Sequence, residues 1–369
     1  MNKIKAAANA STRLKPGLRK TKIQNLAIVT GGGDCPGLNA AIRAVVRRAA
    51  ESDVQCWGVL EGFRGLYEGQ MKELSPLDVS GIISRGGTIL GTSRFNPLKP
   101  QDGLQKIKKN LADRNIDCLI NIGGEGTMRL SHELEKKGIK TLGIPKTIDN
   151  DVWGTDFTFG FDTAVSIATE AIDRLHTTAE SHSRIMILEV MGRHTGWIAT
   201  YSGLAGGADA ILVPEEAFSL KELIEIIEWR QQAGKRFSIL VVSEDAKIIL
   251  DCASGKPRLL QTPSHYDEYG KVQLGGIGAV LEAELRKHLK AEIRNTVLGY
   301  VQRGGSPTAY DRVLATRLGV AAAELALQGK HGLMVGLQGK EIKPIFLSKV
   351  VRKLKTVDLT LYHLSKIFY

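Results

Sequence analysis

The sequence predicts an α/β protein with mainly parallel sheets, divided into two domains. From Ile23 onward, short apolar runs alternate with stretches of helical periodicity, which is typical of parallel strands joined by crossover helices. The 40 glycines cluster after the apolar runs, where loops at the strand ends of such folds meet phosphates. A chain of 369 residues with 43% hydrophobic residues is long enough for about two domains with packed cores. We therefore expect sheets that are covered by helices on both faces.

The first expected strand, 26–30, is the apolar run Leu-Ala-Ile-Val-Thr, which leads into three glycines. A helix over 38–50 follows, and strand, glycine loop and helix form a unit that binds phosphate at a helix N-terminus. Further apolar runs predict strands at 56–60, 118–122, 141–144, 184–190, 210–213, 237–242 and 295–300. Helical periodicity between them predicts helices at 101–114, 163–180, 220–233 and 279–291. The stretch 247–278 has clustered Gly, Pro, Ser and Tyr, so we expect an irregular insertion there.

Charge and cysteine content limit the possible functions. The net charge is +11, but residues 1–22 hold seven positive charges and no negative one, which leaves +4 for the rest. We expect 1–22 to be a disordered basic arm, because it lacks the apolar core of a secretory signal. No nucleic-acid reader motif accompanies the basic residues, and no apolar stretch approaches the roughly 20 residues of a membrane span. The four cysteines lack a CxxC or zinc spacing, which favours reduced thiols in a cytoplasmic protein.

Two loops about twenty residues apart carry groups suited to phosphoryl transfer. Gly-Gly-Glu-Gly-Thr at 123–127 follows an apolar strand, and its glycines let backbone N–H groups approach a polyphosphate. Glu125 is expected to bind a Mg²⁺ ion that is coordinated by that phosphate. Pro-Lys-Thr-Ile-Asp-Asn-Asp at 145–151 follows the next strand and places Asp149 and Asp151 on either side of an asparagine. One of these carboxylates could accept a hydroxyl proton.

The chain resembles 6-phosphofructokinases of the bacterial type from about Lys22 to about Leu337. Six segments occur in the order found in that family, at 32–43, 86–95, 123–127, 147–151, 191–193 and 302–307. The resemblance implies the phosphofructokinase fold, with two Rossmann-like three-layer domains. It implies a phosphoryl-donor domain at 23–160 plus 297–345, a fructose 6-phosphate domain at 161–296 that contains the insertion, and a C-terminal segment at 346–369.

The resemblance also implies where the phosphoryl donor binds. The matching residues are Gly33, Arg94, Phe95, Gly124, Glu125, Gly126, Thr127 and Lys146. The family usually has Asp at the place of Glu125 as its Mg²⁺ ligand, so the carboxylate is retained with one more methylene. Arg94 offers a planar, permanently charged fork to phosphate oxygens.

The catalytic and acceptor positions follow from the same resemblance. Asp149 would take the proton from the 1-hydroxyl of fructose 6-phosphate, with Thr147, Arg94 and Arg193 as its catalytic neighbours. Further substrate positions are Asp151, Arg184, Met191, Gly192, Glu244, Arg294, Tyr300 and Arg303. Tyr300 stands where bacterial ATP enzymes carry His, and a phenol can still hydrogen-bond a phosphate oxygen. In the family, the residues matching Arg184 and Arg294 reach across a subunit interface, which implies a homotetramer or a dimer.

The phosphoryl donor is the finer question. In pyrophosphate-dependent relatives an Asp stands at the place of Gly126 and obstructs the α-phosphate of ATP. The absence of a side chain at Gly126 favours ATP, whereas Lys146 resembles the pyrophosphate type. We weight the open path at Gly126 more heavily and expect an ATP-dependent 6-phosphofructokinase of glycolysis, with the pyrophosphate-dependent phosphotransferase as the alternative.

Other classes of protein explain fewer of these residues. A nicotinamide-dependent oxidoreductase is disfavoured, because 31–37 is not GxGxxG and no acidic residue ends a second strand at the expected place. A lipid or NAD kinase would share the glycine loop at 123–127 but would not explain 294–307. In a non-enzymatic subunit the catalytic carboxylates are expected to be replaced, and Asp149 and Asp151 are both present.

Overall fold

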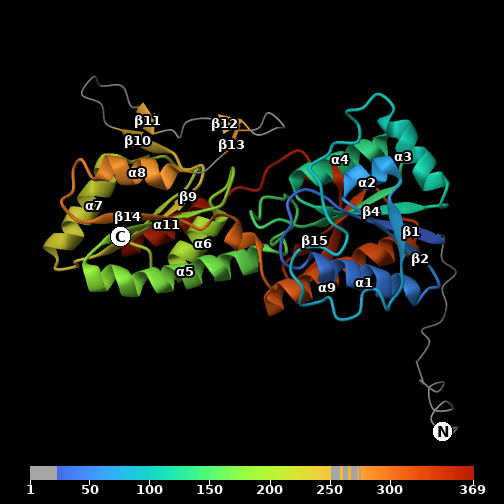
Figure 1. The fold of residues 1–369 in the computed structure, drawn as a ribbon, viewed down its shortest axis with the longest axis horizontal. Helices are drawn as coiled ribbons and strands as arrows, with labels where there is room; N and C mark the ends of the chain where they lie inside the picture. Colours follow the sequence, from blue (N-terminus) through green and yellow to red (C-terminus); the bar gives the residue numbers. More distant parts are fainter. Residues whose placement is uncertain (1–22, 251–257, 261–264, 267–271, 274–275) are drawn as a thin grey trace, which may run out of the picture.

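The computed structural model describes residues 23–250, 258–260, 265–266, 272–273 and 276–369. The predicted basic arm, 1–22, and much of the predicted insertion lie outside the described residues. The chain forms two main sheets that lie one beyond the other along the long axis of the molecule, each with helices packed against it (Figure 1). The predicted α/β class with mainly parallel sheets is confirmed.

The larger sheet has the strand order β16-β15-β5-β4-β1-β2-β3. Its central strands β15, β5, β4, β1 and β2 run parallel, and the edge strands β3 and β16 pair antiparallel. In chain order the strands are β1 (Asn25–Thr30), β2 (Gln55–Val59), β3 (Met71–Leu74), β4 (Cys118–Gly123), β5 (Thr141–Pro145), β15 (Leu333–Gln338) and β16 (Glu341–Phe346).

Both faces of the larger sheet are covered, which explains the near-continuous apolar runs of its inner strands. In β1, Leu26 and Ile28 pack in one cluster with residues of α1 (Leu38–Ala50) and α9 (Ala309–Leu327). Ala27 and Val29 point the other way, toward α2 (Phe63–Glu68), α3 (Gly103–Ala112) and α4 (Glu125–Lys136). Each apolar residue of the strand therefore meets a helix layer.

The smaller sheet is wholly parallel, in the order β14-β6-β9-β7. Its strands are β6 (Ile185–Val190), β7 (Ala210–Leu212), β9 (Ser238–Ser243) and β14 (Ile293–Val297). Helices α5 (Phe161–His182) and α6 (Trp197–Ala205) cover one face, and α7 (Leu220–Gln232) and α8 (Ile277–Leu285) cover the other.

The region from residue 247 to the last strand of the smaller sheet differs from prediction. Its described part is not wholly irregular, because β10 (Ile248–Leu250) joins β8 (Phe218–Ser219) and β11 (Arg258–Leu260), and β12 (His265–Tyr266) pairs with β13 (Val272–Gln273). The predicted helix at 279–291 ends at Leu285, since the chain needs the following residues to return to the start of β14. The predicted strand at 295–300 lies at Ile293–Val297 instead. Gly299, with a φ of 52°, begins the 3₁₀ helix η1 (Gly299–Arg303).

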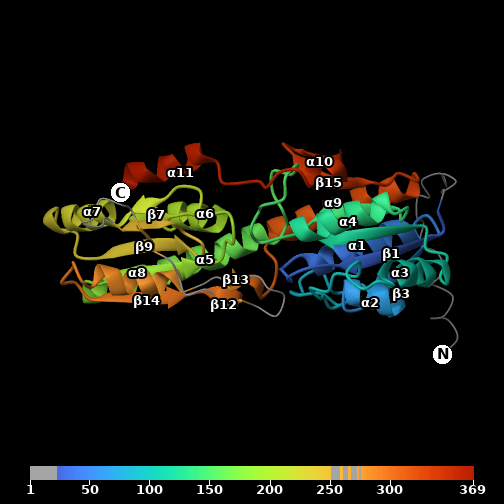
Figure 2. The same cartoon turned by 90° about the horizontal axis from the view of Figure 1, so that it is seen from above.

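The C-terminal residues run along one side of both sheets. Helix α10 (Leu347–Val350) lies beside the larger sheet, and α11 (Leu359–Ser365) and η2 (Lys366–Phe368) lie beside the smaller one (Figure 2). The segment between α10 and α11 therefore crosses from one half of the molecule to the other. Across the described ranges, no helix combines the length and apolarity needed to cross a membrane.

Candidate active site

Most of the predicted site residues gather where the carboxyl ends of the two main sheets meet, and Arg184 and Arg294 do not. The loops after β1, β4 and β5 come from the larger sheet, and the loops after β6 and β9 come from the smaller one. A hydrogen bond of 3.1 Å from Thr195 Oγ1 to the carbonyl of Asp149 joins the two groups of loops. Ligands of open α/β folds bind at this end of the strands.

The loop after β1 is held by hydrogen bonds to its backbone carbonyls. Thr92 Oγ1 donates to the carbonyls of Thr30 (3.1 Å) and Gly32 (2.7 Å). Lys146 Nζ donates to the carbonyl of Gly31 at 3.2 Å and also to the carbonyl of Gly33. The loop borders a pocket of about 260 Å³ that is lined by Gly32, Gly33, Asp34, Thr92, Ser93, Arg94, Tyr300 and Arg303.

Lys146 is only 3% exposed, and this burial lowers the pKa of its ammonium group. The resemblance predicts Lys146 beside the phosphoryl donor. In the structure its ammonium contacts the loop 31–37 after β1, which we call the donor loop. Because its hydrogen bonds go to two carbonyls of that loop, Lys146 fixes the backbone that would face the terminal phosphate. Its charge also acts on Asp149 and lowers the pKa of that carboxyl.

Glycines keep this pocket open in two different ways. A Cβ atom on Gly33 would lie 2.0 Å from Arg303 Nη1, so the flexible head group of that arginine would have to shift to admit a side chain. Gly126 is different, because a Cβ atom there would meet nothing within 4 Å. Gly126 lies in the first turn of α4, whose N-cap residue Gly124 has no side chain over the helix end. The N-terminus of α4 can therefore offer its N–H groups to a phosphate.

The other predicted donor residues border the same region. Thr127 is buried, and its hydroxyl lies against the backbone of Gly31 and Gly123. Phe95 stacks at a tilt on Tyr67 with ring centroids 5.3 Å apart. Arg94 is exposed at the pocket wall.

The loop 147–151 after β5 is a turn that its own side chains fix. Thr147 Oγ1 accepts a hydrogen bond of 3.1 Å from the N–H of Asp149. Asn150 has a φ of 50°, and its Oδ1 accepts a hydrogen bond of 3.0 Å from the N–H of Thr158. Asparagine tolerates this left-handed conformation better than most residues. The turn presents the two flanking carboxylates, Asp149 and Asp151, from a rigid backbone.

Three carboxyl groups of the site have pKa values above their ordinary range. Burial raises the pKa of Asp149, although Arg303, Lys146, His194 and Arg193 act in the opposite direction. Burial, and then the charge of Asp149, raises the pKa of Asp151 to about 7. Burial also raises the pKa of Glu244 to about 7, with Asp149 as the next cause. Such shifts concentrate at functional sites, where groups are held in costly positions.

The donor set around Asp151 fits a hard metal ion. Asp151 Oδ1 is buried and has no hydrogen-bond partner among the described residues. The charge of Glu125 is a further cause of the raised pKa of Asp151, after burial and the charge of Asp149, so the two carboxylates lie in the same region. Glu125 also pairs with Arg129 one turn along α4. Mg²⁺ is commonly held by one or two carboxylates together with phosphates and water.

The loops of the smaller sheet meet η1. Met191 N–H donates to Gln302 Oε1 at 3.3 Å, and Gly192 N–H donates to Glu244 Oε1 at 3.4 Å. Gly192 has a φ of 144°, in the region that favours glycine. These contacts fix the backbone immediately before Arg193. Tyr300, on η1, is 75% exposed and lines the pocket.

Arg303 and the pair Arg184 and Arg294 are placed differently. Arg303 lies between the donor loop and Asp149, since its Nη1 donates to the carbonyl of Asp34 at 3.4 Å. Arg184 lies at the amino end of β6, and Arg294 is opposite Met186. The six residues of β6 span about 20 Å. Within one chain, Arg184 and Arg294 are therefore remote from Met191–Arg193.

Glu292 joins these two remote arginines. Arg184 Nε donates to Glu292 Oε2 at 2.8 Å, and Arg294 pairs with Glu292 Oε1. The two guanidinium groups are thus gathered on one surface at the end of the smaller sheet.

Several residues of the site were missed by the sequence reasoning. His194 and Thr195 follow Arg193, and each acts on Asp149 through charge or a hydrogen bond. Their position next to a predicted residue was the available signal. Lys355 contacts Asn150 from the C-terminal segment, and no local pattern could have indicated it.

The comparisons with known proteins agree with this geometry. The family model described as phosphofructokinase matches residues 25–326. The chain is 51% identical to a pyrophosphate–fructose 6-phosphate 1-phosphotransferase of Amycolatopsis mediterranei, over 93% of this chain and 98% of the relative. It is 48% identical to an ATP-dependent 6-phosphofructokinase of Mycobacterium leprae, over 93% and 99%. The crystal structure of Pichia pastoris phosphofructokinase in the T-state matches with a TM-score of 0.76 and 30% identity, covering 94% of this chain and 36% of that chain.

Proposed function

The chain belongs to the phosphofructokinase family, and we propose that it transfers the terminal phosphoryl group of ATP to the 1-hydroxyl of fructose 6-phosphate. The products are fructose 1,6-bisphosphate and ADP. One observation carries the proposal: a partly buried carboxylate, Asp149, lies within the electrostatic reach of Arg303, Lys146, His194 and Arg193, and Arg303 also lines a pocket bordered by glycines. This combination provides a base and the positive charge that a transferring phosphoryl group requires.

Asp149 is the general base in this mechanism. The 1-hydroxyl oxygen of the sugar attacks the terminal phosphorus while its proton passes to the Asp149 carboxylate, and the bond to the leaving ADP oxygen breaks. Burial raises the pKa of Asp149 and makes it a stronger base than an exposed aspartate, and the surrounding cations partly offset this rise. Thr147 and Thr195 hold its backbone on both sides.

The arginines stabilise the charge on the transferring group. Arg94 and Arg303 line the pocket on the donor side, and Arg193 follows the fixed backbone of Gly192 on the sugar side. Electrostatic stabilisation by groups that are already in place is the largest contribution to such reactions. Glu125 and Asp151 would hold a Mg²⁺ ion, which when bound neutralises charge on the donor phosphates.

Arg193 and Arg303 act on Asp149 within this chain, and the sugar 6-phosphate needs further fixed cations. We assign this role to Arg184 and Arg294 of a neighbouring subunit, because Glu292 gathers them on a surface remote from the base. Active sites shared between subunits require a homo-oligomer, and the family resemblance favours a tetramer. Glu244 and Tyr300 complete the sugar side within the chain.

The open space at Gly126 supports ATP as the donor, since the α-phosphate and nucleoside need a clear path past the start of α4. Relatives named as ATP-dependent enzymes, such as that of M. leprae, also support it. Pyrophosphate is the second candidate. It is favoured by the buried Lys146 behind the donor loop and by the printed name of the A. mediterranei relative.

A side-by-side assay with ATP and pyrophosphate tests the proposal. Each donor is supplied with Mg²⁺ and saturating fructose 6-phosphate, and fructose 1,6-bisphosphate is measured. We expect ATP to give the higher kcat/KM. If product forms with pyrophosphate and not with ATP, pyrophosphate replaces ATP as the proposed donor. If no product forms with either donor, the proposed function is overturned.

A further inference from the structure

The C-terminal segment contacts the catalytic turn at a place that the mechanism above does not use. Lys355 lies beyond the residues 25–326 that match the family model. It nevertheless reaches the loop 147–151, which is 205 residues earlier in the sequence at Asn150. The segment between α10 and α11 carries this lysine across the two halves of the molecule (Figure 2).

Every donor of the Lys355 ammonium group is used on this loop and the residues after it. Nζ donates to Asn150 Oδ1 at 2.9 Å, to the carbonyl of Thr155 at 3.0 Å and to the carbonyl of Asp156. The backbone N–H of Lys355 also donates to the carbonyl of Asp151 at 3.0 Å. Lys355 therefore holds the turn through both its side chain and its backbone.

Asn150 is the residue on which the turn depends. It has a φ of 50° and lies between the two carboxylates of the site. Its Oδ1 has two donors, the N–H of Thr158 and the ammonium of Lys355. Without the second donor, Asn150 would keep the bond from Thr158 and a longer bond of 3.5 Å from its own Nδ2 to the carbonyl of Asp156, which leaves less support for a left-handed backbone that is costly for a residue other than glycine.

The same segment also contacts the loop that carries Arg193. The carbonyl of Lys355 accepts a hydrogen bond of 3.0 Å from Trp197 Nε1, and its ammonium lies 4.9 Å from the centroid of the Trp197 ring. Two residues later, the N–H of Val357 donates to Glu215 Oε1 at 3.0 Å, and Gly196 N–H donates to the same carboxylate. The segment thus joins the base-bearing turn to the start of α6.

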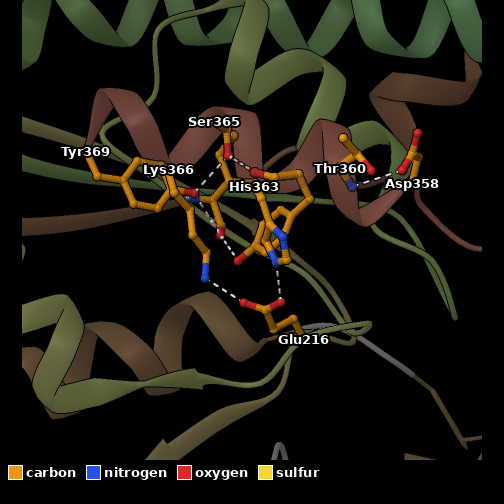
Figure 3. A network of polar contacts seen from close by, with 9 residues as sticks. Glu216, Asp358, Thr360, His363, Ser365, Lys366 and Tyr369 are labelled. Atoms are coloured by element: carbon orange, nitrogen blue, oxygen red, sulfur yellow. Dashed lines mark hydrogen bonds and ion pairs between the residues drawn. The ribbon is translucent and has the colours of Figure 1, made fainter.

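Helix α11 anchors this segment at its far end. Figure 3 shows Glu216 between His363 and Lys366, with a bond of 2.6 Å to His363 Nε2. The ring of Tyr362 is fully buried, and its hydroxyl donates to the carbonyl of Ile211 at 3.0 Å. The position of Lys355 is therefore defined from the larger sheet on one side and from the smaller sheet on the other.

We propose that Lys355 is a positioning residue, which holds Asn150 and thereby orients Asp149 and Asp151 toward the reacting groups. The proposal rests on the proposed function for the role of Asp149. All three donors of the Lys355 ammonium are used within the protein, so we expect it to act on turnover rather than on substrate binding. A misplacement of a base by about 1 Å can cost up to roughly 100-fold in rate.

Lys355→Met tests the proposal, because it keeps the apolar stem beside Trp197 and removes the ammonium. We expect kcat to fall by roughly 10- to 100-fold, while KM for fructose 6-phosphate changes by less than about threefold. The matched control is Lys353→Met, which removes an exposed charge from the same segment and should leave kcat unchanged. Unchanged kcat in folded Lys355→Met would overturn the proposal. If that variant does not fold, Lys355→Gln replaces it with the same expectation.

A double-mutant cycle with Asn150→Gly separates positioning from general destabilisation. Glycine accepts the φ of 50°, so this variant removes the side chain that Lys355 holds. We expect the double variant to lose less turnover than the product of the two single losses, because Lys355 is proposed to act mainly through Asn150. Losses that multiply would show independent roles and overturn the proposal.

Hydrogen exchange distinguishes failure of this inference from failure of the proposed function. Peptides that cover 147–158 should exchange faster in Lys355→Met than in the unmodified protein, without any substrate. Equal exchange would overturn the inference even if the enzyme phosphorylates fructose 6-phosphate. If the unmodified protein is inactive and the variant still exchanges faster, only the proposed function is rejected.

Discussion

Asp149, Asp151 and Glu244 are carboxyl groups whose pKa values all lie above their ordinary range, and burial is the first cause for each. The surrounding cations only partly offset this cost. An arrangement of this kind is unfavourable for folding and useful for chemistry, because it keeps a base poorly solvated and leaves oxygens for a metal ion or a hydroxyl. Single substitutions at these positions should therefore change activity and stability in opposite directions.

Asp149→Asn should lower kcat by roughly 100-fold or more, because the amide cannot accept the hydroxyl proton. Binding of fructose 6-phosphate should persist, since the side chain keeps its size. Steady-state kinetics and a direct binding titration check both points. Asp113→Asn, on the exposed end of α3, is the control, and turnover near that of the unmodified enzyme in Asp149→Asn would contradict the assignment of the base.

Gly126→Asp should reduce kcat/KM for ATP by about tenfold or more. The variant has room to fold, because nothing lies within 4 Å of a Cβ atom at this position. Its carboxylate would repel the α-phosphate in a partly dehydrated cleft, at a cost on the order of several kcal/mol. Gly126→Ala adds the Cβ atom without charge and should keep most ATP activity. If the ATP kinetics of Gly126→Asp are unchanged, the open space at Gly126 no longer supports ATP as the donor.

Asp151→Asn should stabilise the ligand-free protein at pH 8 and have little effect near pH 4. The folded-state pKa of about 7 lies above the ordinary value of 3.8, so the native state binds more protons than the unfolded state between these values. The free energy of unfolding of the unmodified protein therefore falls as pH rises from about 4 to about 7. The variant should lose this dependence, with a gain at pH 8 on the order of 1 kcal/mol or more.

Thermal unfolding of both proteins at pH 4 and pH 8, without metal or substrate, measures this difference. A variant that is equally destabilised at both values would show that Asp151 contributes hydrogen bonds rather than a buried charge.

Most inner strands followed the sequence, although the inner strand β15 and the 19-residue helix α9 were not predicted. The inner strands β1, β4, β5, β6 and β9 were predicted because each is buried on both faces and reads as a continuous apolar run. The edge strands β3 and β16 were not predicted. Their sequences, Met-Lys-Glu-Leu and Glu-Ile-Lys-Pro-Ile-Phe, contain exposed charges that suit the rim of a sheet.

Part of the candidate site was indicated by the sequence, whereas the contact from the C-terminal segment was not. Asp149 lies in a loop after a predicted strand, Gly126 lies in the first turn of α4, and Arg193 was indicated by the family resemblance. Lys355 has no such context, because its role depends on a contact with Asn150 that only the folded chain creates. The domain boundaries that the resemblance implies also stay a prediction.

The packing of helix α11 should be stabilised more by the buried ring of Tyr362 than by the ion pairs on its surface. Tyr362→Ala should lower the free energy of unfolding by about 3–5 kcal/mol, because a fully buried aromatic ring is lost. Glu216→Gln weakens the contacts with His363 and Lys366 in Figure 3 and should cost less than about 1 kcal/mol. Denaturant unfolding of both variants gives the comparison, and similar losses in the two would contradict this ranking.

The two sheets contribute different parts of the proposed reaction, and a third part is expected from another subunit. The larger sheet supplies the donor loop and Asp149, and the smaller sheet supplies Arg193 and Glu244. Arg184 and Arg294 lie at the opposite end of β6. A single chain would therefore hold the base and the donor without these two arginines.

Mixed oligomers should regain activity if sites are shared. Arg184→Ala subunits lack the donated cation, and Asp149→Asn subunits lack the base, so a hybrid contains some sites with both groups intact. We expect activity to rise above that of either variant after subunit exchange, with native mass spectrometry to demonstrate hybrids. Hybrids that form and stay inactive would place Arg184 outside the partner's site.

The contact between Lys355 and Asn150 also has a consequence during synthesis. The two residues are separated by 205 positions, and at roughly 5–20 residues per second the ribosome needs about 10–40 s to pass from one to the other. The glycine loops and the base-bearing turn are translated long before the lysine that holds them. A nascent chain can therefore fold its larger sheet in part and still lack a positioned base. On this view full turnover is reached only after the segment that follows α10 has left the ribosome and packed across both halves of the molecule.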